Sequence, residues 1–202
     1  MALSGKGNNE RILDELEFYF KRLPDYIKQD RNFKNHHDDI FTALQDIYPK
    51  LGLYDIITFL NSKGFKQLKE KTDQYIKKEG LEKAIEDAIK NPSEFISVSL
   101  FDTKNETDMV GMFLGSQFNH PLNLWNVSSV ENMAYMFGDS KYNHPINNWD
   151  VSSVTDMEGI FEGSLFNHPL NDWDVSSVED KSYMFLEPPF NGGPLRTPTG
   201  DN

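Results

Sequence analysis

The hexapeptide Trp-Asp-Val-Ser-Ser-Val at residues 149–154 belongs to a repeat that organises half of the chain. The stretch WNVSSV at 125–130 precedes it, and WDVSSV at 173–178 follows it at the same spacing. Because each unit of such a repeat buries its apolar face only against the next unit, this regular period predicts stacked repeats. Aromatic residues keep the same spacing at four further positions: Phe118, Tyr142, Phe166 and Phe190.

Three full repeats follow one another, at about 118–141, 142–165 and 166–189. A first, degenerate repeat precedes them, and in it Glu106 stands where the later repeats have Val. A fifth repeat begins and is broken off by Gly-Gly-Pro. Degenerate first and last units are typical of the caps of a repeat array. We therefore expect a repeat domain over residues 93–190 and a disordered tail over 191–202.

The residue pattern within one repeat predicts its local structure. Trp and the first Val of the hexapeptide alternate with polar residues, so we expect both side chains to point inward, while Asp and Ser form turn contacts. The extended residue before Pro predicts a short strand over 166–170. Ser153, with Asp156 three residues later, predicts a short capped helical turn. The methionines that recur at helical spacing are interpreted as core: Met109, Met112, Met133, Met136, Met157 and Met184.

The first ninety residues carry helical patterns. Apolar residues at i, i+3 and i+4 spacing, followed by Pro or Gly, predict five helices. We expect these helices to form a small bundle, a helical domain over residues 1–92. The predicted helices cover residues 9–23, 36–48, 54–61, 66–78 and 81–90.

The repeats resemble those of a known family. Their pattern, F-N-x-x-L-x-x-W-D-V-S-S-V-x-x-M-x-x-M-F, resembles the BspA-like branch of leucine-rich-repeat proteins, and more closely the repeats of mycoplasma surface lipoproteins. The resemblance covers about residues 95–190 and implies a right-handed solenoid that binds proteins or surfaces and has no enzymatic activity. The predicted fold class is therefore α+β, with an N-terminal helical bundle followed by a short leucine-rich-repeat-like solenoid of about four 24-residue coils.

Equivalent residues of stacked repeats are expected to form ladders along the stack. We interpret the asparagine ladder as inward amides that satisfy loop backbone groups. The tryptophans recur so regularly that we interpret them as core rather than as binding hot spots. The two structural ladders are Asn119, Asn143 and Asn167, and Trp125, Trp149 and Trp173.

The histidines His120, His144 and His168 would form a third column. Three stacked imidazoles could bind a metal or respond to pH. The alternative is a half-exposed turn column without a ligand. We favour this alternative, because no carboxylate repeats beside the histidines at ligand spacing.

Charge is distributed unevenly along the chain. Residues 91–202 contain four basic residues, Lys104, Lys141, Lys181 and Arg196, and carry the whole net charge of −12. Such an acidic half repels nucleic-acid phosphate and favours a protein partner with a basic surface. We therefore expect no direct nucleic-acid binding, and the sequence leaves the oligomeric state open.

Several functional classes are not supported by any motif. The chain has no Cys, no apolar run long enough to cross a membrane, and no secretory signal at its N-terminus. These features predict a soluble protein of the cytoplasm, or of the cytoplasm of a host if the chain is an effector or a viral protein. Because no catalytic arrangement, phosphate-binding loop or metal-ligand spacing is recognisable, we expect no enzyme, no cofactor and no metal.

Acids that do not repeat are the best candidates for a binding surface, because the repeating ones are explained by the frame. The leading hypothesis is a non-enzymatic protein–protein interaction module with an acidic surface. The alternative is an acidic inhibitor or effector, of phage, viral or mobile-element type, that blocks a basic nucleic-acid-binding protein. The candidate partner-binding residues are Asp139, Glu158, Glu162, Asp172 and Glu179.

Overall fold

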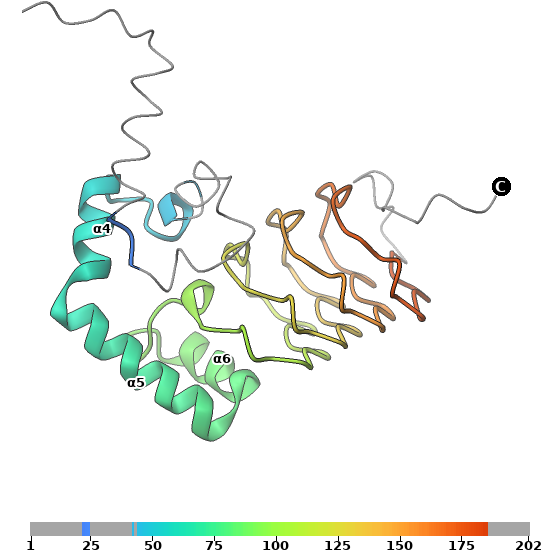
Figure 1. The fold of residues 1–202 in the computed structure, drawn as a ribbon, viewed down its shortest axis with the longest axis horizontal. Coiled ribbons are helices and arrows are strands. Elements are labelled where there is room, and N and C mark those ends of the chain that lie inside the picture. The colour runs from blue at the N-terminus through green and yellow to red at the C-terminus, as the bar shows by residue number, and fades with distance from the viewer. Residues whose placement is uncertain (1–21, 25–41, 43, 186–202) are drawn as a thin grey trace, which may run out of the picture. The chain divides into compact units, whose positions relative to one another are not determined.

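The structure is a computed structural model that describes residues 22–24, 42 and 44–185 (Figure 1). The contacts of the chain divide it into two compact units, residues 1–67 and 68–202. This division lies within helix α5 (Lys63–Glu79). It differs from the domain boundary at residues 92 and 93, which stays a prediction.

Helix α4 (Leu53–Asn61) belongs to the first compact unit and confirms the helix predicted over 54–61. Its buried residues, Ile56, Ile57 and Leu60, lie on one face at the spacing from which the helix was predicted. The predicted helices at 9–23 and 36–48, like the predicted tail at 191–202, lie wholly or mostly outside the described residues.

Helix α5 and helix α6 (Leu81–Lys90) confirm the helices predicted over 66–78 and 81–90. Gly80 joins them at φ 92°, in the left-handed region that glycine adopts without a steric cost. This backbone lets α6 begin directly after Gly80. The inner face of α6 is apolar and consists of Leu81, Ala84, Ile85 and Ala88.

Side chains of α5 hold the segment that leads into the repeats. The buried hydroxyl of Thr72 accepts a hydrogen bond from the N–H of Ile96 at 3.3 Å. The ring of Tyr75 packs edge-on against Phe95, with ring centroids 5.2 Å apart. A short 3-10 helix, η2 (Val98–Leu100), follows. The greater part of α5 and all of α6 therefore belong to the same compact unit as the repeats.

Regular backbone hydrogen bonds join each repeat to the next. In the second repeat, the N–H groups of alternate residues from Met133 to Asp139 donate to the carbonyls of alternate residues from Asp156 to Glu162, at 2.7–2.9 Å. The alternate N–H groups from Met136 to Ser140 donate to carbonyls three positions earlier in the chain. One half of the N–H groups thus binds the next repeat, and the other half closes turns. Both series also run through the first and third repeats.

The predicted α+β fold class with a leucine-rich-repeat solenoid is wrong, because the described part of the chain contains no β-strand. Only isolated parallel bridges occur there, joining residues 108, 132, 156 and 180 in series. The strand predicted over 166–170 is likewise absent. In the segments that carry the bridges, turn closure uses every second N–H group, and left-handed residues such as Tyr135 and Asp139 interrupt the extended backbone. In the segment 166–170, the N–H of Asn167 donates to the side chain of Asn143 instead of to a backbone carbonyl.

The hexapeptide forms a turn held by its own acid. Oδ1 of Asp150 accepts hydrogen bonds from the N–H of Ser152 at 3.2 Å and from its hydroxyl at 2.6 Å. This confirms the predicted turn contact. The predicted helical turn after Ser153 is wrong, since these residues form turns and the hydroxyl of Ser153 donates to the carbonyl of Ser128 at 2.9 Å.

The core of the repeats consists of two aromatic columns. The buried indoles of Trp125, Trp149 and Trp173 donate their N–H groups at 2.9–3.0 Å to the carbonyls of Val98, Leu122 and Ile146, respectively. The predicted core role of the tryptophans is confirmed, and the recurring methionines are buried too, except the half-buried Met112. The second column stacks rings at centroid distances of 5.6, 5.8 and 5.9 Å and consists of Phe113, Phe137, Phe161 and Phe185.

Candidate protein-binding site

Two left-handed backbone positions, four residues apart, recur along the repeats. The first position is occupied alternately by glycine and tyrosine, at residues 111, 135, 159 and 183, with φ of 53–61°. The second has glycine at 115 and 163 and Asp139 between them, with φ of 51–65°. Non-glycine residues rarely adopt this conformation. The turn and inter-repeat hydrogen bonds hold Tyr135 and Asp139 in it.

Glycine alternates with larger residues because one repeat covers the next. A Cβ atom added at Gly159 would lie 2.4 Å from Cε1 of Tyr135, and one added at Gly163 would lie 2.3 Å from Oδ1 of Asp139. Both distances are shorter than the contacts that Cβ atoms make in proteins. The Tyr135 ring and the Asp139 carboxylate therefore lie across the turn of the third repeat, and glycine there makes room for them.

These turns bring non-repeating side chains together along one edge of the repeats, which we name the turn strip. In the first repeat the strip is apolar and exposed, with Val110 at 47% and Leu114 at 55% exposure. The side chain of Leu114 reaches Gly138 of the second repeat. Tyr183, at 58% exposure, lies at the other end. The turn strip comprises Val110, Leu114, Tyr135, Asp139, Glu158, Glu162 and Tyr183.

Tyr135 and Glu158 form the polar centre of the turn strip. The Tyr135 hydroxyl donates to Oε1 of Glu158 at 2.7 Å. This hydrogen bond is the main cause that raises the pKa of Tyr135 to about 12, followed by burial and by the charges of Glu158 and Glu162. All these causes favour the protonated phenol. At neutral pH the tyrosine is therefore a neutral donor beside anionic carboxylates.

The carboxylates of the turn strip have no cationic partner within the described residues. The ion pairs found there lie on α5 and α6, between Lys71 and Glu94, and between Lys104 and Asp102. Three of the five predicted partner-binding acids, Asp139, Glu158 and Glu162, are thus gathered on one edge and left unneutralised. An edge of this kind can attract basic groups of another protein.

The other two predicted partner-binding acids lie outside the turn strip. Asp172 is tied to the preceding repeat, because its carboxylate accepts a hydrogen bond from the Asn147 amide at 2.5 Å and its N–H donates back to the same side chain at 3.0 Å. Glu179 is exposed, and its N–H donates to the carbonyl of Thr155 at 2.7 Å. Asp172 therefore serves the frame, and Glu179 is a separate exposed acid.

The asparagine and histidine columns connect neighbouring repeats. The Asn119 amide oxygen accepts the N–H of Asn143 at 2.9 Å, and the Asn143 amide oxygen accepts the N–H of Asn167 at 3.0 Å. These asparagines satisfy backbone groups, as we expected, but they are exposed rather than inward. His144 and His168 each donate Nε2–H to an asparagine carbonyl at 3.1 Å. The described residues place no three His, Asp or Glu side chains suitably for a metal ion.

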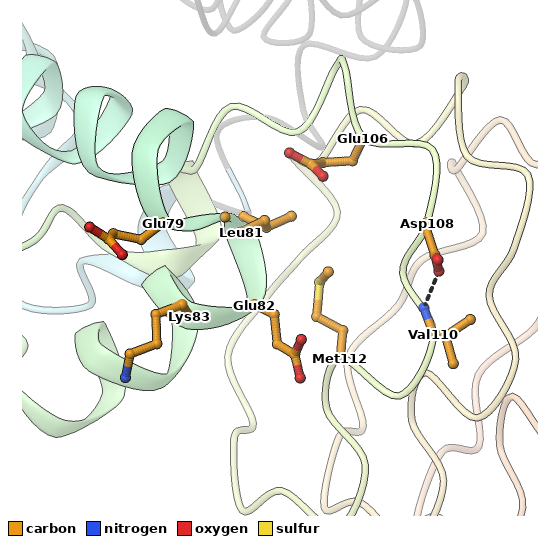
Figure 2. Close-up of a pocket in the computed structure, with 9 residues that line it drawn as sticks. Glu79, Leu81, Glu82, Lys83, Glu106, Asp108, Val110 and Met112 are labelled. Carbon is orange, nitrogen blue, oxygen red and sulfur yellow. Dashed lines mark hydrogen bonds between the residues drawn. The ribbon is translucent and has the colours of Figure 1, made fainter.

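A pocket of about 320 Å³ lies where α6 meets the first repeat (Figure 2). Leu81, Val110 and Met112 provide its apolar lining. Its charged lining comprises Glu79, Glu82, Lys83, Glu106 and Asp108.

The repeat pattern does not predict this pocket, but the acid at position 106 indicates it. The N–H of Glu106 closes the same turn as the N–H of Val130, but Val130 is fully buried whereas Glu106 is half-buried at the pocket. Burial, with a contribution from the charge of Asp102, raises the pKa of the Glu106 carboxyl. An acid at a core position of a degenerate repeat is thus a usable sign of an opening in the core.

Comparison with known proteins adds one finding. The family described as "Mycoplasma protein of unknown function, DUF285" matches residues 81–193, which is more than half of the chain. Searches of curated proteins and of solved structures found no match. Within the described residues, no helix has both the length and the apolar character that a membrane span needs. The family match begins at the first residue of α6 and includes all the repeats, so the chain belongs to the DUF285 family.

Proposed function

We propose that this chain is a non-enzymatic protein-binding module and that the turn strip binds a partner with a basic surface. The observation that carries the proposal is the gathering of Asp139, Glu158 and Glu162, without cationic partners among the described residues, beside exposed tyrosine and aliphatic side chains. Protein interfaces combine such aromatic and apolar anchors with complementary charge.

The construction of the turn strip also supports binding. Its backbone is held by hydrogen bonds within and between repeats, so its side chains are displayed from a rigid frame. Rigid display reduces the entropy that is lost on association. The frame residues recur in each repeat, whereas the acids and aliphatic residues of the strip do not, so packing of the frame does not account for them.

The resemblance to BspA-like surface proteins supports the same class of function. That family resemblance implies binding to proteins or surfaces, and the family to which the chain belongs has itself no described function. A place on a cell surface or in the cytoplasm is compatible with the turn strip.

The proposal is tested by quantitative affinity capture from extracts of the native host. The double variant Glu158→Gln/Glu162→Gln removes two strip charges. The control variant Glu131→Gln/Glu179→Gln removes two exposed charges of the same type outside the strip. We expect the strip variant to lose a partner that the wild type and the control both retain. Equal retention by both variants would contradict the proposal.

Salt dependence provides a second readout of the same experiment. If basic groups of the partner meet the strip carboxylates, capture by the wild type falls as ionic strength rises, because salt screens exposed charges. The strip variant should show a weaker salt dependence than the control variant. A partner whose capture is independent of salt would show that the charged part of the proposal is wrong.

A further inference from the structure

The pocket at the junction of α6 and the first repeat adjoins the turn strip. Val110 belongs to both, since it lines the pocket and forms the apolar end of the strip. A partner that lies along the strip therefore reaches the mouth of the pocket. The pocket and the strip therefore form one continuous binding surface.

The carboxylates of the pocket are available to a cation. Figure 2 shows the Glu106 side chain extending toward the side of Leu81, and Lys83 extending away from the repeat. The Lys83 ammonium is engaged by Asp87 at 2.9 Å and by Glu86 at 3.5 Å. Within the described residues, Glu106 and Glu82 have no hydrogen-bond or ion-pair partner for their side chains. The lysine of the lining thus leaves these two acids unneutralised.

The apolar lining favours a long cationic side chain over a free metal ion. Leu81, Val110 and Met112 offer surface to methylene groups, which basic side chains bury while their charged ends reach polar groups. A volume of about 320 Å³ is at the lower end of the range for ligand pockets. It suits one inserted side chain rather than a large ligand.

We propose that this pocket takes the guanidinium group of an arginine side chain from the partner that lies on the turn strip. This inference rests on the proposed function. Arginine fits better than lysine, because its planar guanidinium donates paired hydrogen bonds to carboxylates and is more weakly hydrated. Glu106 and Glu82 are the acceptors, and Leu81 and Met112 contact the stem.

The dimensions of the strip define the partner segment. Neighbouring repeats are joined by backbone hydrogen bonds, so the four rows of the strip extend over about 15 Å, the length of about five extended residues. The partner is therefore a short extended segment, with its arginine at the end that lies on the first repeat and with further basic residues facing Glu158 and Glu162.

The test uses a library of displayed random linear peptides selected on the full chain. Binding of each selected peptide is then measured on the wild type, on Glu106→Val and on the strip variant Glu158→Gln/Glu162→Gln. Glu106→Val introduces the residue that the later repeats carry at this position, so the fold is expected to persist. Glu106→Gln, which keeps the shape of the side chain, is the second pocket variant, and thermal unfolding checks all variants.

We expect the selected peptides to share one arginine. Its change to alanine should weaken binding to the wild type about tenfold, but weaken binding to Glu106→Val clearly less, because the interaction with Glu106 is already absent there. Binding that depends on the strip but not on Glu106, or a shared lysine instead of arginine, would overturn the arginine pocket and leave the proposed function standing. Binding that survives neutralisation of the strip, or the absence of any strip-dependent peptide, would overturn both.

Discussion

Gly159 shows how a single residue adjusts one repeat to its neighbour. Its left-handed φ of 55° does not by itself require glycine, because Tyr135 and Tyr183 adopt the same conformation at the equivalent positions. The requirement comes from the ring of Tyr135, whose Cε1 would lie 2.4 Å from an added Cβ. Replacing Gly159 by alanine must therefore displace the ring as well as strain the backbone.

We predict that Gly159→Ala lowers the free energy of unfolding by about 2–4 kcal/mol, combining overpacking with left-handed strain. The matched control is Gly115→Ala, at φ 65° with no atom near an added Cβ, which should cost about 1 kcal/mol from strain alone. In a Tyr135→Gly background the cost of Gly159→Ala should shrink to that of the control. Urea unfolding measures all three, and equal losses at 115 and 159 would show that the ring contact is unimportant.

Tyr135 also provides a pH-dependent signal. Its pKa in the folded protein, about 12, is above the ordinary value of 10.0, because Glu158 accepts its hydrogen bond. The folded state therefore retains the phenol proton longer than the unfolded state does. The stabilisation is fully present below the ordinary pKa and is lost as the pH rises through the folded pKa.

We predict that Glu158→Gln lowers the pKa of Tyr135 toward its ordinary value, because the neutral amide removes a negative charge and accepts a weaker hydrogen bond. A titration of the Tyr135 ring carbons by nuclear magnetic resonance checks this, and Glu131→Gln serves as the control. An unchanged titration in Glu158→Gln would mean that the hydrogen bond does not form in solution.

At the scale of the element, the tryptophans contribute hydrogen bonds as well as buried apolar area. Each indole N–H reaches a carbonyl of the preceding segment, and the Trp149 N–H donates to Leu122 at 3.0 Å. The Leu122 carbonyl also accepts the backbone N–H of Trp125 at 2.9 Å, so the indole supplies the second of its two hydrogen bonds. The column therefore couples packing to the satisfaction of backbone groups.

We predict that Trp149→Phe lowers the free energy of unfolding by about 2–4 kcal/mol, because it leaves a cavity and removes one of the two hydrogen bonds that the Leu122 carbonyl accepts. The exposed Tyr183→Phe should change it by less than about 0.5 kcal/mol. Circular dichroism during urea unfolding compares the two without relying on indole fluorescence. A loss in Trp149→Phe no larger than in the control would contradict the account of the core.

Some elements could be predicted from the sequence because their period reports burial directly. The helices at 54–61, 66–78 and 81–90 follow from apolar spacing, and the tryptophan column follows from the regular recurrence of the hexapeptide. The period does not tell whether successive N–H groups bind the next repeat or close a turn. Strands and helical turns were therefore predicted in repeats that consist of turns.

At the scale of the whole molecule, most of α5 and all of α6 belong to the same compact unit as the repeats, and α5 packs against the segment that leads into them. Thr72 and Tyr75 of α5 contact the segment at residues 95 and 96, and the inner face of α6 is buried. The compact unit begins at residue 68, and the family match begins at residue 81. A fragment that lacks both helices would expose Phe95 and Ile96, which lead into the repeats.

We predict that a fragment of residues 68–202 unfolds cooperatively near the midpoint of the corresponding transition in the full chain. A fragment of residues 93–202 should unfold at a clearly lower temperature, because Ile96 and Phe95 lose their partners. Scanning calorimetry of both fragments checks this. Equal midpoints would instead support an independent domain boundary at residues 92 and 93.

The candidate site could be predicted only in part, because it depends on which turns face the same way. Treating non-repeating acids as candidates identified Asp139, Glu158 and Glu162, which share the turn strip. It also selected Asp172, whose bonds to Asn147 are local to the frame. The contributions of Tyr135 and Leu114 depend on left-handed turns and on glycines in the next repeat, which no linear spacing reveals.

The most direct test of the central claim is the dissociation constant of a purified partner obtained by host capture, measured by isothermal titration calorimetry. The titration compares the wild type, Glu158→Gln/Glu162→Gln and Glu131→Gln/Glu179→Gln at one fixed ionic strength. We predict that the strip variant weakens binding about tenfold or more and that the control stays within about twofold of the wild type. Equal affinities for the two variants would contradict the claim that the turn strip is the binding surface.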